Sequence, residues 1–214
     1  MINQQDIGEI YNKSFNIFEP YNIVIYLTFF SPLIIIMGIV SLSFIFQNFK
    51  GILYLCILLI CIVFREQLYN LGYLKANTIN RNNICDTIQY SKNGNPSFSA
   101  FVFAFTIMYI CLPMFIYGSI NYWILSGLLS YFLIDIRIKY LYNCFSVGDV
   151  LLNIFVGAVI SSILILIMIS SNGLKPYVFF NEMSSNKEIC SMTKKQTFKC
   201  SVYKNGELIN SVMT

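Results

Sequence analysis

Long uncharged apolar stretches divide this chain. Their bounds are residues 21–46, 51–64, 97–120, 123–134 and 150–169. The first has 26 residues, which form about 39 Å of α-helix, more than the roughly 30 Å of a bilayer's hydrocarbon core. The second has only 14 residues, so we expect its helix to continue past Arg65 and Glu66 to Leu74, with both charges snorkelling or paired. The pattern predicts about five transmembrane helices.

The composition also indicates a membrane protein. Hydrophobic residues make up 57% of the chain and charged residues 11%, against about 25% charged in globular proteins. We expect an all-α, multi-pass membrane protein with a helical bundle over residues 21–170 and an extramembrane cap over 171–214. Residues 1–20 are too acidic for a secretory signal and form either an interfacial helix or a frayed terminus.

The tail after residue 170 differs in composition from the bundle. It holds six of the fourteen basic residues, and Asn205-Gly206 lies between two β-prone runs, the strongest short-range signal for a hairpin. We therefore predict a small β-hairpin in the cap, which would offer protein partners a docking surface. Cys190 and Cys200 either form a disulfide that staples the cap or remain free thiols.

The remaining cysteines are expected to pack as small apolar side chains. They are Cys56, Cys61, Cys85, Cys111 and Cys144. The chain has no histidine and no Cys-x-x-Cys pair, so we expect neither a metal site nor another cofactor. Membrane lipids are the expected non-protein partners, and nucleic acid is not expected.

Basic residues near the spans are distributed unevenly between the two faces of the membrane. With five spans, the amino-terminal segment, the 65–96 loop and the 135–149 loop share one face. That face carries Lys13, Arg65, Lys75, Arg81, Lys92, Arg137 and Lys139, and the other carries Lys50, Lys175 and Lys187. Seven basic residues against three predict a cytoplasmic amino terminus and a lumenal or extracellular cap.

Three segments on the shared face carry the candidate chemistry. They are Lys75-Ala-Asn-Thr-Ile-Asn-Arg81, Gly94-Asn-Pro-Ser-Phe-Ser-Ala-Phe101 and Lys139-Tyr-Leu-Tyr-Asn-Cys-Phe-Ser-Val-Gly-Asp149. Their charges either converge on one pocket at the membrane surface or serve as separate snorkelling anchors. In the order of the motifs and in the helix-loop-helix layout, the segments resemble the type 2 phosphatidic acid phosphatase superfamily over about residues 50–170, although five residues rather than six separate Lys75 from Arg81. This superfamily includes lipid phosphate phosphatases, dolichyl diphosphatases and glucose-6-phosphatase.

The resemblance implies a phosphate pocket that has lost its catalytic groups. In such enzymes a histidine attacks phosphorus and a second histidine protonates the leaving group, while cations, a serine and backbone N–H groups hold the phosphoryl oxygens. Phe145 stands at the position of the nucleophile, Ser99 at that of the turn histidine and Phe98 at that of the turn glycine. The vestigial phosphate or lipid-headgroup pocket would consist of Lys75, Arg81, Ser97, Ser99, Lys139 and Asp149, and Phe98 and Phe145 would plug it.

A chain without histidine cannot use the phosphohistidine mechanism. The retained residues either bind an anion weakly or hold the bundle together through an ion pair of Asp149 with Lys139 or Arg137. We therefore expect a catalytically inactive, phosphatase-like membrane protein that acts as a structural or lipid-interacting scaffold. The alternatives are a divergent lipid phosphatase with another nucleophile, such as Cys144, and a transporter or channel component, which the nearly uncharged spans disfavour.

The chain is also rich in Ile, Asn, Tyr and Phe, which is compatible with an AT-rich coding genome such as those of some large DNA viruses or protists. A place in the inner membrane of a virion or in a host endomembrane is therefore a further hypothesis.

Overall fold

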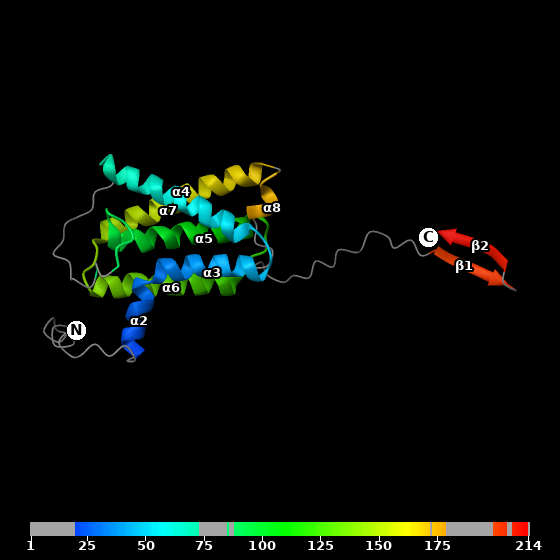
Figure 1. The fold of residues 1–214 in the computed structure, drawn as a ribbon, viewed down its shortest axis with the longest axis horizontal. Helices are drawn as coiled ribbons and strands as arrows, with labels where there is room; N and C mark the ends of the chain where they lie inside the picture. The colour runs from blue at the N-terminus through cyan, green and yellow to red at the C-terminus, as the bar shows by residue number, and fades with distance from the viewer. Residues whose placement is uncertain are drawn as a thin grey trace.

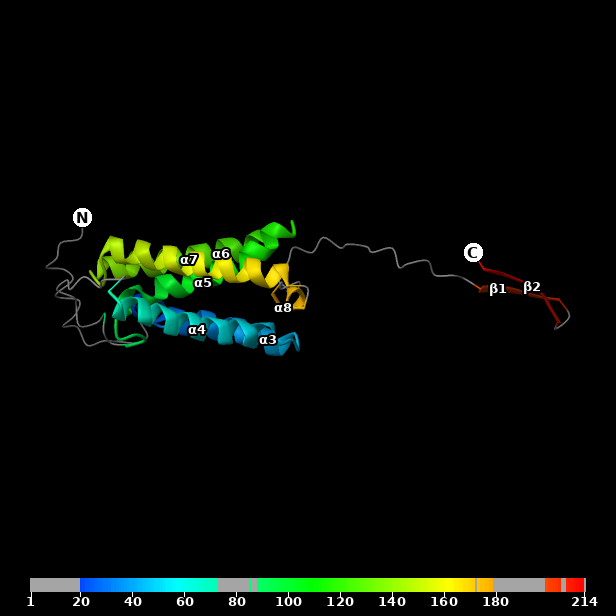
Figure 2. The ribbon, with the colours of Figure 1, turned by 90° about the horizontal axis from the view of Figure 1, so that it is seen from above.

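A helix with apolar side chains on every face lies at the centre of the fold. The computed structural model describes residues 20–72, 85, 88–171, 173–178, 199–204 and 207–213. Its central helix is α5 (Phe98–Ile116), because a helix that is apolar all round must be covered on all sides. The helices around it are α3 (Ser31–Ile45), α4 (Lys50–Asn70), α6 (Tyr122–Leu141) and α7 (Val147–Ser170), as Figures 1 and 2 show.

The bundle has two ends. The end called here the loop end holds residues 88–97, with the short helix η2 (Asn95–Ser97), and residues 142–146 between α6 and α7. The end called the turn end holds residues 46–49 and 117–121, which join consecutive helices, and α8 (Lys175–Val178). The α4, α5, α6 and α7 helices therefore run in alternating directions along the bundle.

Three described helical segments are long and apolar enough to cross a membrane. They are α4, residues Asn95–Ile116 and α7, and the bent pair formed by α2 (Pro20–Phe29) and α3 is a fourth candidate. Of the most apolar window of Asn95–Ile116, 72% is buried inside the protein, against 28% for α4 and for α7. The prediction of an all-helical bundle is confirmed, and three or four of the roughly five predicted spans are long and apolar enough to cross a membrane, with α5 inside the bundle and α4 and α7 at its periphery.

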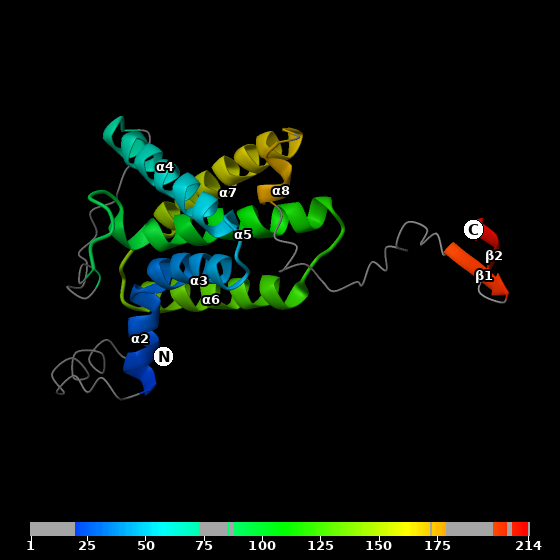
Figure 3. The same cartoon turned by 45° about the vertical axis from the view of Figure 1, so that its right-hand side comes forward.

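The prediction of one straight helix over residues 21–46 is wrong. The chain breaks at Phe30, and α2 and α3 meet at an angle of 70° (Figure 3). Pro32 lies in the first turn of α3, where backbone N–H groups make no hydrogen bond within the helix, so a residue without an N–H is tolerated. Inside a continuous helix the same proline would remove a backbone hydrogen bond and clash with the preceding turn. The α2 helix consequently turns across the loop end.

Two other helix boundaries also differ from the prediction. The α4 helix ends at Asn70 and not at Leu74, because Gly72 takes the left-handed conformation, with φ of 78°, and closes the last turn onto the carbonyl of Tyr69. The α6 helix begins after Asn121, whose side chain caps Trp123 and Ile124, and it continues beyond the predicted residue 134 to Leu141.

The tail contributes two paired segments. The backbone of β1 (Lys199–Lys204) pairs antiparallel with β2 (Glu207–Met213), with an irregularity between Val202 and Tyr203. Their side chains, and residues 179–198, lie outside the description. The predicted role of residues 171–214 as a cap therefore stays a prediction.

The tightest helix contact in the core joins α5 to α7. Gly157 of α7 lies against the backbone of α5, where an added Cβ would be 2.7 Å from the carbonyl oxygen of Phe101. One turn later, Ser161 donates a hydrogen bond of 3.0 Å to the carbonyl of Phe105. Small residues allow this approach, as at many interfaces between membrane helices.

We predict that Gly157→Ala destabilises the bundle by about 1–3 kcal/mol, the range for an overpacked core. The new methyl group would meet a backbone atom that cannot rotate away. Gly38→Ala in α3 is the matched control, because nothing lies within 4 Å of its added Cβ and alanine favours the helix by up to about 1 kcal/mol. Denaturant unfolding in detergent micelles measures both variants, and equal stabilities would contradict the close contact between α5 and α7.

Candidate functional site

The structure divides the predicted pocket into two polar clusters. Ser97 and Ser99 lie at the start of α5, Lys139 lies in the last turn of α6 and Asp149 lies in the first turn of α7. Lys75, Arg81 and Cys190 lie outside the described residues, as does the side chain of Cys200. Ser97 belongs to the Arg65 cluster, which comprises Arg65, Glu66, Tyr69, Ser91, Ser97 and Asn153. Ser99 belongs to the Asp135 cluster, which comprises Ser31, Ser99, Asp135 and Lys139.

Arg65 is the centre of the first cluster. Its side chain is 0% exposed, although the sequence pattern suggested a snorkelling charge as one possibility. Its Nε donates to Oδ1 of Asn153 at 2.8 Å, its Nη1 donates to Oγ of Ser91 at 3.1 Å, and the Glu66 carboxylate lies 3.4 Å from Nη1. The Tyr69 ring lies with its centroid 4.7 Å from Cζ. The guanidinium therefore has polar or aromatic partners on all sides.

Asn153 of α7 completes the Arg65 cluster. Its side-chain nitrogen lies 2.9 Å from the Tyr69 hydroxyl, 3.1 Å from the Ser97 hydroxyl and 2.8 Å from the Asp149 carbonyl. One amide thus links α4, α5 and α7 at the loop end. The Asp149 residue that the phosphatase pattern emphasised enters this network through its backbone carbonyl.

The Gly94 turn presents carbonyl oxygens to the Arg65 cluster. The carbonyl of Gly94 accepts from Nη2 of Arg65 at 3.0 Å and from Ser97 Oγ at 3.0 Å, and the carbonyl of Asn93 lies 3.4 Å from Nη1. A phosphate-binding turn offers N–H groups to its ligand, whereas these atoms carry partial negative charge. The part of the turn that faces inward is therefore suited to a cation, and Arg65 is that cation.

Phe98 and Phe145, the predicted plugs, are both buried but lie in different surroundings. Phe98 stacks on Tyr90 with ring centroids 5.5 Å apart, and its centroid is 5.4 Å from Cζ of Arg65. Phe145 packs in a cluster with Ile138, Val150 and the cysteine pair described below. Their packing is compatible with a filled pocket, and the plugging role itself stays a prediction.

Asp135 is the centre of the second cluster. It is 1% exposed, and its carboxylate accepts from Ser31 Oγ at 2.6 Å and from Ser99 Oγ at 2.7 Å. The Lys139 ammonium lies 2.9 Å from Oδ1 of Asp135, one turn away in the same helix, and donates to Ser99 Oγ at 2.6 Å. The cluster joins α3, α5 and α6 and carries one charge of each sign.

The predicted ion pair of Asp149 with Lys139 or Arg137 is wrong for both partners. Lys139 pairs with Asp135, which the i,i+4 spacing on α6 places on the same helix face, and Arg137 lies on the exposed face of that helix. No ion pair joins Asp149 to a basic side chain within the part of the chain that the structure describes.

Tyr90 covers the Asp135 cluster from the loop. Its hydroxyl donates to the carbonyl of Phe29 at 3.0 Å. Burial, together with the nearby Asp135 carboxylate, raises the pKa of Tyr90 above its ordinary value. The phenol therefore remains a donor at neutral pH.

A disulfide joins Cys85 to Cys144, so the prediction of free, packing thiols is wrong for these two residues. Cys144 cannot act as a nucleophile while it is bonded to Cys85, because the attacking species would be a thiolate. The expectation holds for Cys61 and Cys111, which are free and buried, whereas Cys56 is free but exposed.

Arg65, Asp135 and Asn153 are the central residues of the two clusters, and the sequence prediction did not assign them to the candidate site. Each is a polar residue in an otherwise apolar helix, and in membrane proteins such residues face the bundle interior and find partners. Their place within apolar helices is the sequence signal for these residues, whereas most residues of the phosphatase pattern lie in the loops.

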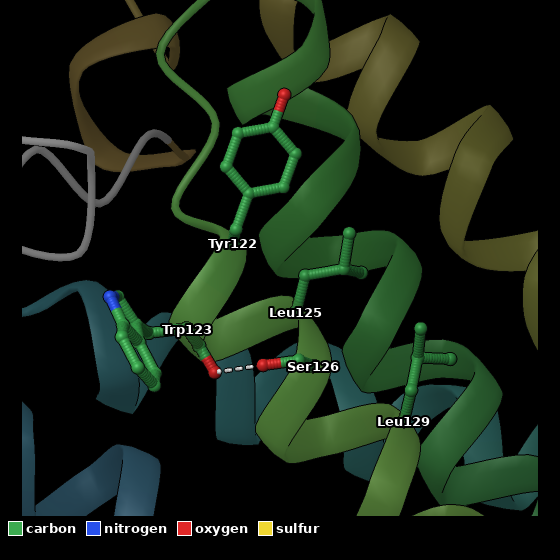
Figure 4. Close-up of a pocket in the computed structure, with 5 residues that line it drawn as sticks. All are labelled: Tyr122, Trp123, Leu125, Ser126 and Leu129. Carbon is green, nitrogen blue, oxygen red and sulfur yellow. Dashed lines mark hydrogen bonds between the residues drawn. The ribbon is translucent and has the colours of Figure 1, made fainter.

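An apolar groove lies at the opposite end of the bundle. It is lined by Tyr122, Trp123, Leu125, Ser126 and Leu129 of α6 (Figure 4). The Ser126 hydroxyl donates to the carbonyl of Trp123, and no charged residue lines this groove.

Among the described residues, no group of three Cys, Asp or Glu side chains could hold a metal ion. The loop end therefore remains the candidate functional site.

Comparisons of this chain with protein families, with characterised proteins and with solved structures give no match. The geometry of the two clusters is thus the main basis for a functional proposal.

We predict that Lys139→Met and Asp135→Leu each destabilise the protein by about 3–5 kcal/mol, because each leaves one buried charge without its partner. The double variant, which removes both charges, should recover much of this loss. Arg137→Met, an exposed charge two residues from both, is the matched control and should change stability by less than about 1 kcal/mol. A double-mutant cycle from unfolding in micelles measures the coupling, and additive effects would contradict the buried pair.

We also predict that Gly94→Ala destabilises the loop end more than Gly72→Ala does. Both glycines have positive φ, 61° and 78°, so both variants carry the cost of that conformation. Only at Gly94 does an added Cβ meet other atoms, 2.5 Å from the Tyr69 hydroxyl and 3.1 Å from Nη2 of Arg65. The difference between the two unfolding free energies isolates the contact with the Arg65 cluster, and a difference of zero would argue against it.

Proposed function

We propose that this chain is an integral membrane scaffold with a phosphatase-like but non-catalytic helical core. One observation carries the proposal: the retained cation Lys139 is engaged by Asp135 and Ser99, at 2.9 and 2.6 Å. Ser97 is likewise engaged by Gly94 and Asn153. Residues that would hold a phosphoryl group in an enzyme hold neighbouring helices here.

The energetics of the Asp135 cluster support a structural role. For a phosphate to bind the Lys139 ammonium, the ammonium would have to move away from Asp135. The Asp135 carboxylate would then remain buried without a counterion. Breaking a buried pair in this way costs about 3–5 kcal/mol. Phosphate or a lipid headgroup would have to offset this cost before gaining any net affinity.

The same pairing supports α6 as a fifth membrane span. Its carboxyl-terminal part carries Asp135, Arg137 and Lys139, which is more charge than an isolated span tolerates. Asp135 pairs with Lys139, so that, within the described part of the chain, Arg137 is the one unpaired charge of the three. Arg137 lies exposed in the last two turns of α6. Leu129, Leu133 and Ile134 are exposed on the same helix, as expected for a lipid-facing surface.

A divergent hydrolase is a second candidate, because Ser99 has the neighbours of an activated nucleophile. Its hydroxyl lies 2.7 Å from the Asp135 carboxylate and 2.6 Å from the Lys139 ammonium, and serine with a lysine partner is a known nucleophilic arrangement. However, Ser99 is 2% exposed and Lys139 is 4% exposed. A substrate could reach the hydroxyl only after α6 moved away from α5.

A transporter or channel is less well supported. A polar path from the loop end to the turn end would have to pass along α5. There the interior is filled by the stacked rings of Phe101, Phe105 and Tyr109, with centroids 5.9–6.4 Å apart. The two polar clusters lie together at one end of this apolar column.

The scaffold would meet lipid through the exposed apolar faces of α4 and α7 and would meet protein partners through residues 171–214. The apolar faces include Ile60, Val63, Phe155 and Ile167, each more than half exposed. The role of the tail as a cap that binds partners and a place in a viral inner membrane or host endomembrane are parts of this proposal that rest on the sequence alone.

We predict that the full chain, purified and reconstituted in liposomes, releases no phosphate from phosphatidic acid or an isoprenyl diphosphate above the level of empty liposomes. The hydrolase alternative makes the opposite prediction and identifies its nucleophile. Turnover that Ser99→Ala abolishes and Ser97→Ala retains would contradict the scaffold proposal and assign Ser99. Turnover lost in Cys144→Ser would instead assign that thiol, released from its disulfide.

A further inference from the structure

The Cys85–Cys144 disulfide lies at one defined end of the bundle. Cys85 follows α4 in the chain and Cys144 lies between α6 and α7, so both belong to the loop end. Their Cα atoms are 5.4 Å apart across a separation of 59 residues, and they are 2% and 0% exposed. They pack with Ile138, Phe145 and Val150, so the bond forms part of the folded core at this end.

The chemistry of this bond constrains the compartment in which it forms. The two thiols lose two protons and two electrons, and an acceptor disulfide of a thiol oxidoreductase is reduced to two thiols in exchange. Such disulfides persist in the endoplasmic reticulum, outside the cell and in the periplasm, whereas cytosolic thiols are kept reduced. We infer that the loop end of this protein faces an oxidising compartment and that α7 delivers the tail to the cytoplasmic side.

This orientation is opposite to the one that the charge count predicts. Two of the seven basic residues counted for the loop end, Arg65 and Lys139, are 0% and 4% exposed and are satisfied inside the bundle. Five of the counted basic residues therefore remain on the side of the loop end, whereas the tail alone has six lysines. The positive-inside rule is a bias in loop composition and is weakest for long segments, whereas the disulfide requires an oxidant.

The sequence contains a natural reporter of this orientation. Asn12-Lys13-Ser14 is an acceptor pattern for N-glycosylation, which occurs only in an oxidising, lumenal compartment. Residues before α2 include no apolar stretch that could cross a membrane, so Asn12 belongs to the same side as the loop end if α2 and α3 are one broken span.

Translation of the full chain with microsomes from endoplasmic reticulum tests the inference. Three chains are compared: the natural one, one with an added acceptor on a flexible linker before Met1, and one with the same addition after Thr214. We expect the acceptor before Met1 to be glycosylated and the acceptor after Thr214 to remain unmodified; Asn12→Gln then identifies any contribution of the natural site. Glycosylation of the acceptor after Thr214, of both added acceptors or of neither would overturn the inference.

The disulfide itself is tested on the same membranes. Free thiols are trapped during lysis, the protein is digested without reduction, and peptides are identified by mass spectrometry. We expect Cys85 and Cys144 in one linked pair and Cys111 trapped as a free thiol. Trapping of Cys85 and Cys144 as free thiols would overturn the inference even where the glycosylation pattern agreed.

Discussion

The loop end is organised by the need to neutralise charge inside an apolar bundle. An isolated ion in such surroundings costs far more than the whole free energy of folding, so each charge needs a counterion or a full set of hydrogen-bond partners. Asp135 and Lys139 satisfy each other on one helix. Arg65 has one carboxylate, that of Glu66, at 3.4 Å, and takes its other oxygen partners from two segments, the 88–97 loop and α7.

This requirement explains why the 88–97 loop folds inward. Arg65 binds the carbonyl of Gly94, and the side chain of Asn95 holds the loop from the other side, accepting from the Tyr90 N–H at 2.8 Å and donating to the Ile88 carbonyl at 2.7 Å. Gly94 is needed there because only a residue without Cβ fits beside Tyr69 at positive φ. The disulfide then ties Cys85, earlier in the same connection, to the corner between α6 and α7.

The sequence was sufficient to predict a helical membrane-protein class, but not the break at Phe30, the ends of α4 and α6 or the partners within the site. The length of the apolar stretches identified a protein with membrane-spanning helices, because a helix must be long and nearly uncharged to cross a bilayer. Pro32 is a local signal for the break after α2, and Gly72 is a local signal for the end of α4. The lengths of the apolar stretches alone show neither feature. The pairing of Asp135 with Ser31, over 104 positions, and of Cys85 with Cys144 depends on tertiary packing, to which no local pattern points.

The resemblance to phosphatases and the observed chemistry can be reconciled through charge balance. In a phosphatase the pocket cations are compensated by the bound phosphate, and a chain that no longer binds phosphate would leave a buried cation uncompensated. Asp135 lies on the same helix as Lys139 and has two serine hydroxyls on its oxygens. In the phosphatase-like core that we propose, this carboxylate would take the electrostatic place of the phosphate, and it would stabilise the bundle because it cannot dissociate.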